Sequence, residues 1–191
     1  MIISEKIKKL ISIIVIVNIL AVIGYLYFKG CPQNPLNLIS YNATLAFLSI
    51  SISILINYYL WKIPFVNKLF GSIPDINGVW NAEIINTNDN KKQKSQLTIK
   101  QTWFTTQVIT KTKRGNSTTI SSEIIQVNDS WKLYFTWTAS FDGTLFNGTT
   151  IVDIIDNKLD GYYFTNANFD GRKCTSGSFK AKKLLKSNKV K

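Results

Sequence analysis

Side chains that could carry out catalysis are scarce in this chain. It has no histidine and only two cysteines, Cys31 and Cys174. The lack of histidine excludes Ser-His-Asp and Cys-His catalysis and histidine-ligated metals, and the cysteines do not have the spacing of a metal site. The aspartates lie mostly at predicted turns and strand ends, where Asp has structural roles: Asp142, Asp153, Asp156, Asp160 and Asp170. We therefore expect no enzyme, no catalytic residue, no metal and no cofactor.

Another group of residues is suited to binding. Arg and Lys hold phosphates and aromatic rings stack on bases, so cations beside aromatic rings at the end of a β-barrel suit a ligand with both groups. An inward-facing Arg172 is costly without an anionic partner. Ligand contact and a salt bridge to Asp142 or Asp170 both remain open for it. The candidate ligand-binding residues are Arg172, Tyr163, Thr165, Trp137, Lys111 and Lys113.

The sequence that must position these residues has the pattern of β-strands from Gly78 onward. Turn signals divide it into eight predicted strands, with Asn-Asp, Asp-Gly and Asp-Asn pairs as two-residue hairpin loops. Eight antiparallel strands let the last pair with the first, so we predict an all-β domain over 78–185, a compact up-and-down antiparallel β-barrel. If residues 95–113 formed one long strand, the domain would have seven strands and the last would pair parallel with the first. The predicted strands are 79–87, 95–101, 104–113, 117–127, 130–141, 144–155, 158–169 and 172–184.

Tight hairpins also predict which side chains face the interior. The alternating apolar residues from Trp131 to Trp137 define the inner face, which places Trp137 opposite Gly148. The same face continues through Tyr163 and Thr165 and then, across an Asp170-Gly171 turn, into Arg172, Cys174 and Ser176. A one-residue bulge near Gly177 is then needed to turn Phe179 and Ala181 inward.

Two long uncharged runs precede the strands. Residues 10–28 and 43–61 carry no charge, and each is long enough to cross a bilayer as a helix. Lysines flank the outer ends of the two runs, whereas the loop between them holds only Lys29, which predicts cytoplasmic termini and a periplasmic loop. We therefore predict a membrane α-helical hairpin of two transmembrane helices within 1–62. A cleaved signal peptide is the alternative, although the first run is longer than a signal sequence needs.

Polar residues within these runs predict helix contacts. Small and polar residues let helices approach closely in lipid, and Asn18 in the first run needs a partner. Packing within one hairpin and packing between hairpins of neighbouring subunits both remain open. The second run carries a stripe of Asn42, Ala46, Ser49, Ser53 and Asn57.

The remaining segments are basic or interfacial. Residues 63–77 are predicted to form an interfacial linker, and 186–191 a basic tail that either lies against anionic lipid, together with Lys182 and Lys183, or stays solvated. The 23 Lys and Arg against 11 Asp and Glu give a net charge of +12. This excess suits an anionic ligand, nucleic acid or an anionic membrane, and a generally lysine-rich surface is the alternative.

Two short motifs, PDINGVW at Pro74–Trp80 and LDGYYFTNANFDGRKCTSGSF at Leu159–Phe179, complete the pattern. With the two apolar runs and the barrel, they resemble the CBASS antiphage effectors that have two transmembrane helices and a cyclic-nucleotide-sensing β-barrel, the CD-NTase-associated protein 15 family. The resemblance implies a bacterial inner-membrane protein whose barrel binds a cyclic dinucleotide made by a CD-NTase. It further implies a homo-oligomer on activation, disruption of the membrane and cell death by abortive infection, with no DNA or RNA partner.

Two other functions fit the same architecture. A membrane-anchored barrel could carry a lipid or small molecule without killing the cell, and a superinfection-exclusion protein would not use the barrel interior. Loss of membrane integrity in the presence of the ligand would separate the effector from both.

Overall fold

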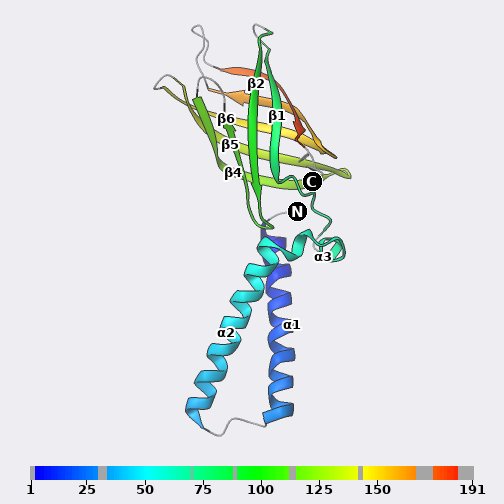
Figure 1. Cartoon of the computed structure of the whole chain (residues 1–191), viewed down its shortest axis with the longest axis vertical. Coiled ribbons are helices and arrows are strands. Elements are labelled where there is room, and N and C mark those ends of the chain that lie inside the picture. Colours follow the sequence, from blue (N-terminus) through cyan, green and yellow to red (C-terminus); the bar gives the residue numbers. More distant parts are fainter. Residues whose placement is uncertain are drawn as a thin grey trace, which may run out of the picture. The chain divides into compact units, whose positions relative to one another are not determined.

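The computed structural model describes residues 3–29, 34–69, 71–87, 90–111, 115–141, 144–166 and 174–184 (Figure 1). The chain forms two compact units, Met1–Ser72 and Ile73–Lys191. The first contains the helices α1 (Ile3–Lys29), α2 (Pro35–Tyr58), η1 (Leu60–Lys62) and α3 (Pro64–Leu69). The described residues of the second form strands and no helix, so the predicted fold class, helices together with an all-β barrel, is confirmed.

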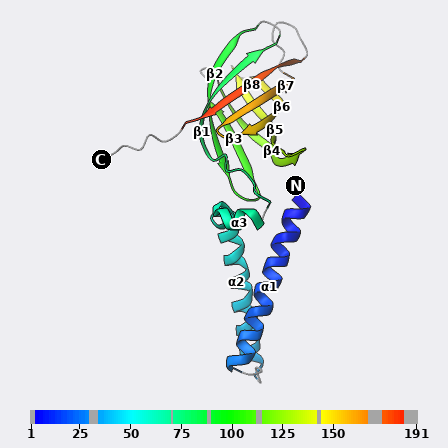
Figure 2. The ribbon, with the colours of Figure 1, turned by 90° about the vertical axis from the view of Figure 1, so that its right-hand side faces the viewer.

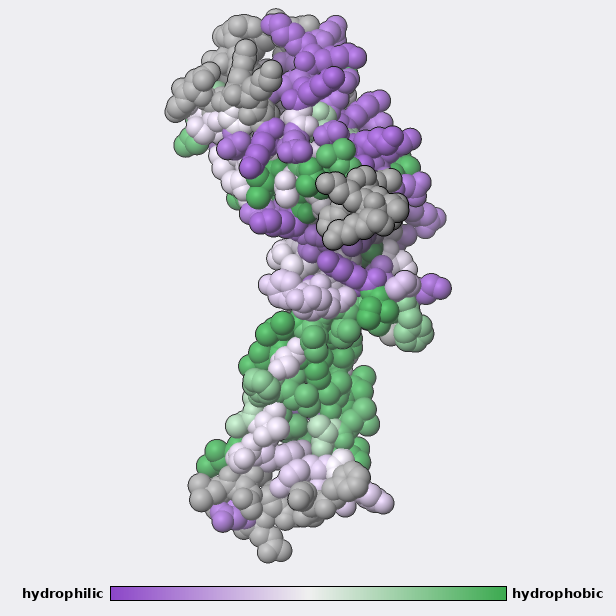
Figure 3. Space-filling model, viewed as in Figure 1, coloured by the Kyte–Doolittle hydropathy of each residue, from purple (hydrophilic) through white to green (hydrophobic). Residues whose placement is uncertain are grey.

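The helical pair α1–α2 is held by polar contacts within an apolar surface. Asn18 Nδ2 donates a hydrogen bond of 2.8 Å to Ser49 Oγ, and the rings of Tyr25 and Tyr41 lie 4.3 Å apart. Asn18 therefore has the partner that its position required, supplied from within the same hairpin. Apolar side chains make up much of the visible face of the pair, and weakly polar side chains lie toward its lower end (Figure 3).

One helix is long and apolar enough to cross a membrane. Among the described residues, Ile39–Lys62 meets this test by length and composition, and Ile11–Tyr27 is a shorter apolar helix. The second of the two predicted spans thus has the length that the sequence indicated.

Eight strands form a closed barrel in which each strand pairs antiparallel with the next and β8 pairs with β1 (Figures 1 and 2). The predicted eight-stranded up-and-down barrel is confirmed, and so are the predicted bounds of β5 and β6. Asn128 and Asp129 both have positive φ, 47° and 62°, as a tight hairpin of this type requires. The strands are β1 (Gly78–Asn86), β2 (Lys92–Gln101), β3 (Thr106–Lys111), β4 (Gly115–Val127), β5 (Ser130–Phe141), β6 (Thr144–Ile155), β7 (Lys158–Thr165) and β8 (Thr175–Lys183).

The predicted register holds from β5 to β7 and fails at β8. Trp137 lies opposite Gly148, which lies opposite Thr165, as expected. However, Thr165 pairs with Thr175, and not with Ser176, the partner that a two-residue turn at 170–171 predicts. The pairing is displaced by one residue, and a one-residue displacement turns every side chain to the other face.

The inner face of β8 is therefore made by other residues than expected. Phe179 and Ala181 do face inward, but through a continuous pairing with β7 rather than a bulge near Gly177. Cys174, predicted to face inward, is exposed, and Ser176 lies on the outer face beside it. The register argument that placed Arg172 inward is thus wrong for the described part of β8, while Arg172 itself lies outside the described residues.

One end of the barrel, where β1 begins, is filled by side chains. Ile73, Ile76, Trp80 and Trp103 are each at most 1% exposed. Buried Gln101 connects the segment before β1 to this end, because its Oε1 accepts from the Ile76 N–H at 2.8 Å. Its Nε2 also donates to the Pro74 carbonyl at 3.0 Å. We call this the plugged end. Residues 73–77, assigned to the linker from sequence, thus pack with the barrel.

The β3–β4 contact is the shortest pairing in the barrel. Only three residue pairs are formed, from Ile109↔Thr118 to Lys111↔Asn116. Further along, the Thr119 hydroxyl replaces a backbone partner: it accepts from the Val108 N–H and donates to the Val108 carbonyl, both at 2.8 Å. A single hydroxyl therefore satisfies two strand groups that would otherwise lack partners.

We predict that Thr119→Val destabilises the barrel by about 1–3 kcal/mol, because the isosteric side chain leaves the Val108 N–H and carbonyl unpaired. Unfolding by denaturant, followed by tryptophan fluorescence, measures the loss. The matched control is Thr118→Val, which changes an exposed threonine of the same strand. Equal stability of the two variants would show that the Thr119 hydroxyl does not stabilise the contact between β3 and β4.

Candidate functional site

Four inward-facing residues of β5, β6 and β7 lie together in the half of the barrel away from the plugged end. Trp137 Nε1 donates a hydrogen bond of 3.0 Å to Thr150 Oγ1, and Thr150 lies opposite Tyr163 on the next strand. Thr165 completes the group and donates to the Asn147 carbonyl at 2.9 Å. We call Trp137, Thr150, Tyr163 and Thr165 the lumen cluster.

Glycines on the inner face make room for the rings of this cluster. A methyl group on Gly148 would overlap the Trp137 indole and lie 2.6 Å from the Phe164 carbonyl oxygen. A methyl group on Gly177 would likewise overlap the Tyr163 ring. Each ring therefore lies against the barrel wall over a residue that has no side chain, an arrangement that fixes aromatic orientation in β-sheets.

The lumen half that holds the cluster is polar but uncharged among the described residues. Thr110, Thr165 and Thr175 are buried there with their hydroxyls, and the buried Ser95 hydroxyl has no hydrogen-bond partner among them. Buried polar groups normally have partners. Hydroxyls and aromatic faces together suit a ligand that stacks and accepts or donates hydrogen bonds.

The predicted binding residues divide into three groups. Trp137, Tyr163 and Thr165 are brought together, as expected. Lys111 ends β3, and its side chain is exposed on the outer wall rather than directed into the lumen. Lys113 and Arg172 lie outside the described residues, as do the proposed salt-bridge partners Asp142 and Asp170.

Sequence reasoning missed Thr150 and the unpaired Ser95. The register did place Thr150 on the inner face, but its role depends on the conformation of Trp137, which alternation does not encode. The useful signal was the pairing of Trp137 with Gly148, because an inward glycine opposite an aromatic residue indicates a ring lying over it.

Almost all charged side chains of the described strands lie on the outer wall of the barrel. On β5 and β6, Lys132 Nζ lies 2.6 Å from Asp153 Oδ1, and this hydrogen bond raises the pKa of Lys132 above its usual value. In the described part of the chain, no group of three or more His, Cys, Asp or Glu side chains could hold a metal ion.

A closed barrel plugged at one end and lined with hydroxyls and aromatic rings toward the other defines a receptor for a small ligand. A family model described as "Cap15, cyclic dinucleotide receptor domain" matches residues 71–183, more than half of the chain. The chain therefore belongs to the Cap15 family. The similar CD-NTase-associated protein 15 of Staphylococcus schleiferi is 28% identical over 156 residues, covering 78% of this chain and 80% of the relative. The resemblance to CBASS effectors with a cyclic dinucleotide sensor is thereby confirmed.

We predict that Gly148→Ala displaces Trp137 and lowers the stability of the barrel by about 1–3 kcal/mol, because the Phe164 carbonyl cannot move away from the added methyl group. Denaturant unfolding measures the loss, and near-ultraviolet circular dichroism reports the displaced indole. Gly24→Ala is the control, since nothing lies within 4 Å of its added methyl group. An unchanged aromatic signal in Gly148→Ala would contradict the packing of Trp137 on Gly148.

Proposed function

We propose that this chain binds a cyclic dinucleotide in the lumen cluster, self-associates in response, and disrupts the bacterial inner membrane to cause cell death. The observation that carries the proposal is the Trp137 indole, held over Gly148 by its hydrogen bond to Thr150 and flanked by Thr165. It lies within a domain that matches the cyclic dinucleotide receptor family.

The ligand contacts follow from the chemistry of these residues. Trp137 and Tyr163 offer ring faces on which two bases can stack, and the hydroxyls of Thr165 and Thr150 can hydrogen-bond to base or ribose edges. The described lumen half has no cation for the phosphates. Arg172 and Lys113, from the connections at this end, are proposed to supply it, with Lys111 reaching the phosphates from the rim.

The helical unit is proposed to be the membrane-disrupting part. Both apolar helices are proposed to cross the inner membrane, with the two termini in the cytoplasm, where a partner CD-NTase would supply the ligand. Large apolar side chains cover the outside of the pair, among them Ile16, Ile23 and Phe47, each more than half exposed. Such a surface suits contact with lipid or with neighbouring copies.

Binding can control the helices only through a difference in affinity. A ligand shifts an equilibrium between monomer and oligomer only if it binds one of them better. Linking subunits through their barrels would also bring their helices to a high effective concentration. No enzymatic step is needed, and no DNA or RNA partner is proposed.

Calorimetry of the full-length protein in nanodiscs against a panel of cyclic di- and trinucleotides tests the receptor function. We expect Tyr163→Leu to weaken binding by about 5- to 150-fold, because base–aromatic stacking contributes about 1–3 kcal/mol. The matched control is Tyr162→Leu, which changes a neighbouring tyrosine that faces outward and is 63% exposed. Binding of no panel member by the unmodified protein would overturn the receptor proposal.

Dye release from proteoliposomes tests the effector function. We expect the cognate ligand to release the dye, and we expect Arg172→Ala to reduce this release because the phosphates lose a charge-assisted contact. Ligand binding without dye release would favour a carrier barrel. If the amount of dye released is the same with and without the ligand, and the same in Arg172→Ala, the result would favour a superinfection-exclusion protein.

A further inference from the structure

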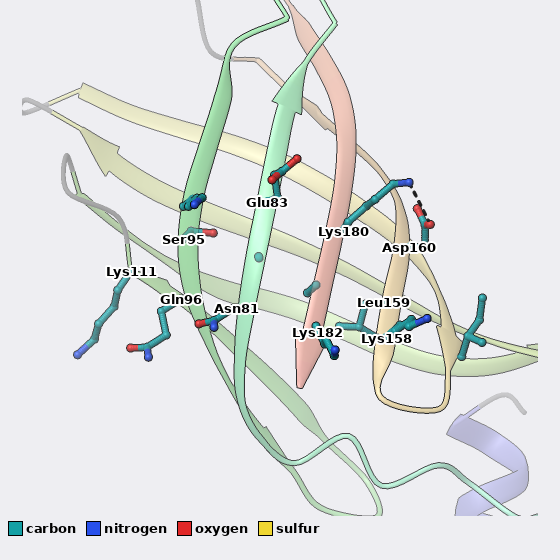
Figure 4. Close-up of a pocket in the computed structure, with 14 residues that line it drawn as sticks. Asn81, Glu83, Ser95, Gln96, Lys111, Lys158, Leu159, Asp160, Lys180 and Lys182 are labelled. Atoms are coloured by element: carbon teal, nitrogen blue, oxygen red, sulfur yellow. Dashed lines mark ion pairs between the residues drawn. The ribbon is translucent and has the colours of Figure 1, made fainter. Parts of the chain in front are cut away.

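A groove on the outer wall of the barrel carries a row of basic and polar side chains outside the lumen cluster. It has a volume of about 960 Å³ and runs across β2, β1, β8 and β7, with Lys111 added from β3 (Figure 4). The registers place five of its residues side by side on successive strands. This lysine row consists of Lys158, Lys182, Asn81, Gln96 and Lys111.

The lysines of this row form no ion pair within the part of the chain that the structure describes. Lys158, Lys182 and Lys111 are exposed and make no ion pair or hydrogen bond among the described residues. Lys158 and Lys182 also lie directly opposite each other, although like charges in that position destabilise a sheet. An anion between the two ammonium groups would remove this cost.

The neighbouring row of the same wall behaves differently. There, Lys180 pairs with Asp160 on the strand opposite, and Glu83 pairs diagonally with Lys92, each with an N···O distance of 3.5 Å. The three lysines of the row form no such ion pair among the described residues. Lys94 and Lys100 on β2 also lack one there, so the feature particular to the row is its directly opposed pair of lysines, Lys158 and Lys182.

The groove chemistry favours lipid headgroups over nucleic acid. No aromatic side chain of the described residues lines the groove, so bases have no ring there on which to stack. Lysines on β7, β8 and β3 present hydrated point charges, which suit several separate phosphates better than one planar group. Between Lys158 and Lys111 lie four strand spacings, roughly 19 Å in all, too wide for one phosphate to bridge.

The length of the chain keeps this groove within reach of a bilayer. Only a short segment separates Leu69, the last residue of α3, from Gly78, the first of β1. Fully extended, it spans at most about 30 Å. Lys182 and Lys158 belong to the plugged end, where this segment joins the barrel, and α2 contributes to the helix long enough to cross a membrane.

We propose that the lysine row binds the headgroup phosphates of an anionic bilayer surface. The proposal concerns the outer wall and depends on membrane insertion, not on dinucleotide binding in the lumen. Basic residues near an anionic leaflet each strengthen attachment by roughly fivefold. Contact between the row and lipid would orient the barrel on the membrane before any ligand arrives.

Lysine footprinting tests this on the full-length protein. The protein is reconstituted in vesicles of phosphatidylcholine alone or mixed with phosphatidylglycerol, and a membrane-impermeant amine reagent is read out by mass spectrometry. We expect phosphatidylglycerol to reduce labelling of Lys158, Lys182 and Lys111 by roughly fivefold, and added salt to reverse this. Lys132, paired with Asp153 on β5 and β6, should label equally in both vesicles.

Equal labelling of the lysine row in the two kinds of vesicle would overturn the proposal. A second sample contains phosphatidylcholine vesicles with single-stranded DNA added and no phosphatidylglycerol. If the DNA protects the lysine row while phosphatidylglycerol does not, the proposal is overturned in favour of a nucleic-acid site. Both results come from the unmodified protein, so neither depends on the folding of a variant.

Paired variants locate the contact. Lys158→Gln/Lys182→Gln should abolish the lipid-dependent protection of Lys111. The control Lys92→Gln/Lys100→Gln removes the same charge from β2 and should preserve it. Dinucleotide affinity measured on the same samples separates the two sites. Loss of Lys111 protection in Lys158→Gln/Lys182→Gln, with unchanged dinucleotide affinity, supports the proposal. Equal protection of Lys111 in the two double variants would mean that only the net charge matters, and would overturn the proposal.

Discussion

Closure of the barrel between β8 and β1 is the constraint on which the rest of the structure depends. Pairing of Ala82 with Ala181 completes the ring of backbone hydrogen bonds and leaves no free sheet edge. Once the ring is closed, every strand has one face directed inward, so a single residue of displacement would exchange lumen and surface. The lumen cluster and the lysine row are both consequences of this register.

The two ends of the closed barrel differ in their chemistry. At the plugged end, Trp80, Trp103 and Ile76 fill the interior and Gln101 satisfies the backbone that leads into β1. Away from it, glycines take the place of bulky inward residues and hydroxyls replace aliphatic groups. The proposed ligand site thus lies in the half of the barrel away from the buried tryptophans.

The separation of charge from the lumen assigns different partners to the two faces of one sheet. Aromatic rings and hydroxyls inside suit bases, and in our proposal Arg172 and Lys113 supply the cations for the phosphates. Outside, Lys180 is paired with Asp160, whereas Lys182 forms no ion pair among the described residues. The proposed ligand site and the proposed lipid contact thus use opposite faces of one barrel wall.

The sequence alone determined the strand count, the hairpins at Asn128-Asp129 and Asp156-Asn157, and the meeting of Trp137 with Gly148 and Thr165. These follow from local rules, since a two-residue turn and strict alternation fix the register of adjacent strands. Only the tertiary structure decided which residues of β8 face inward, that Lys111 points outward, and that the Trp137 indole donates a hydrogen bond to Thr150. The register of β8 differs by one residue from the one that a local turn rule gave, and it is the register of its pairing with β1 and β7.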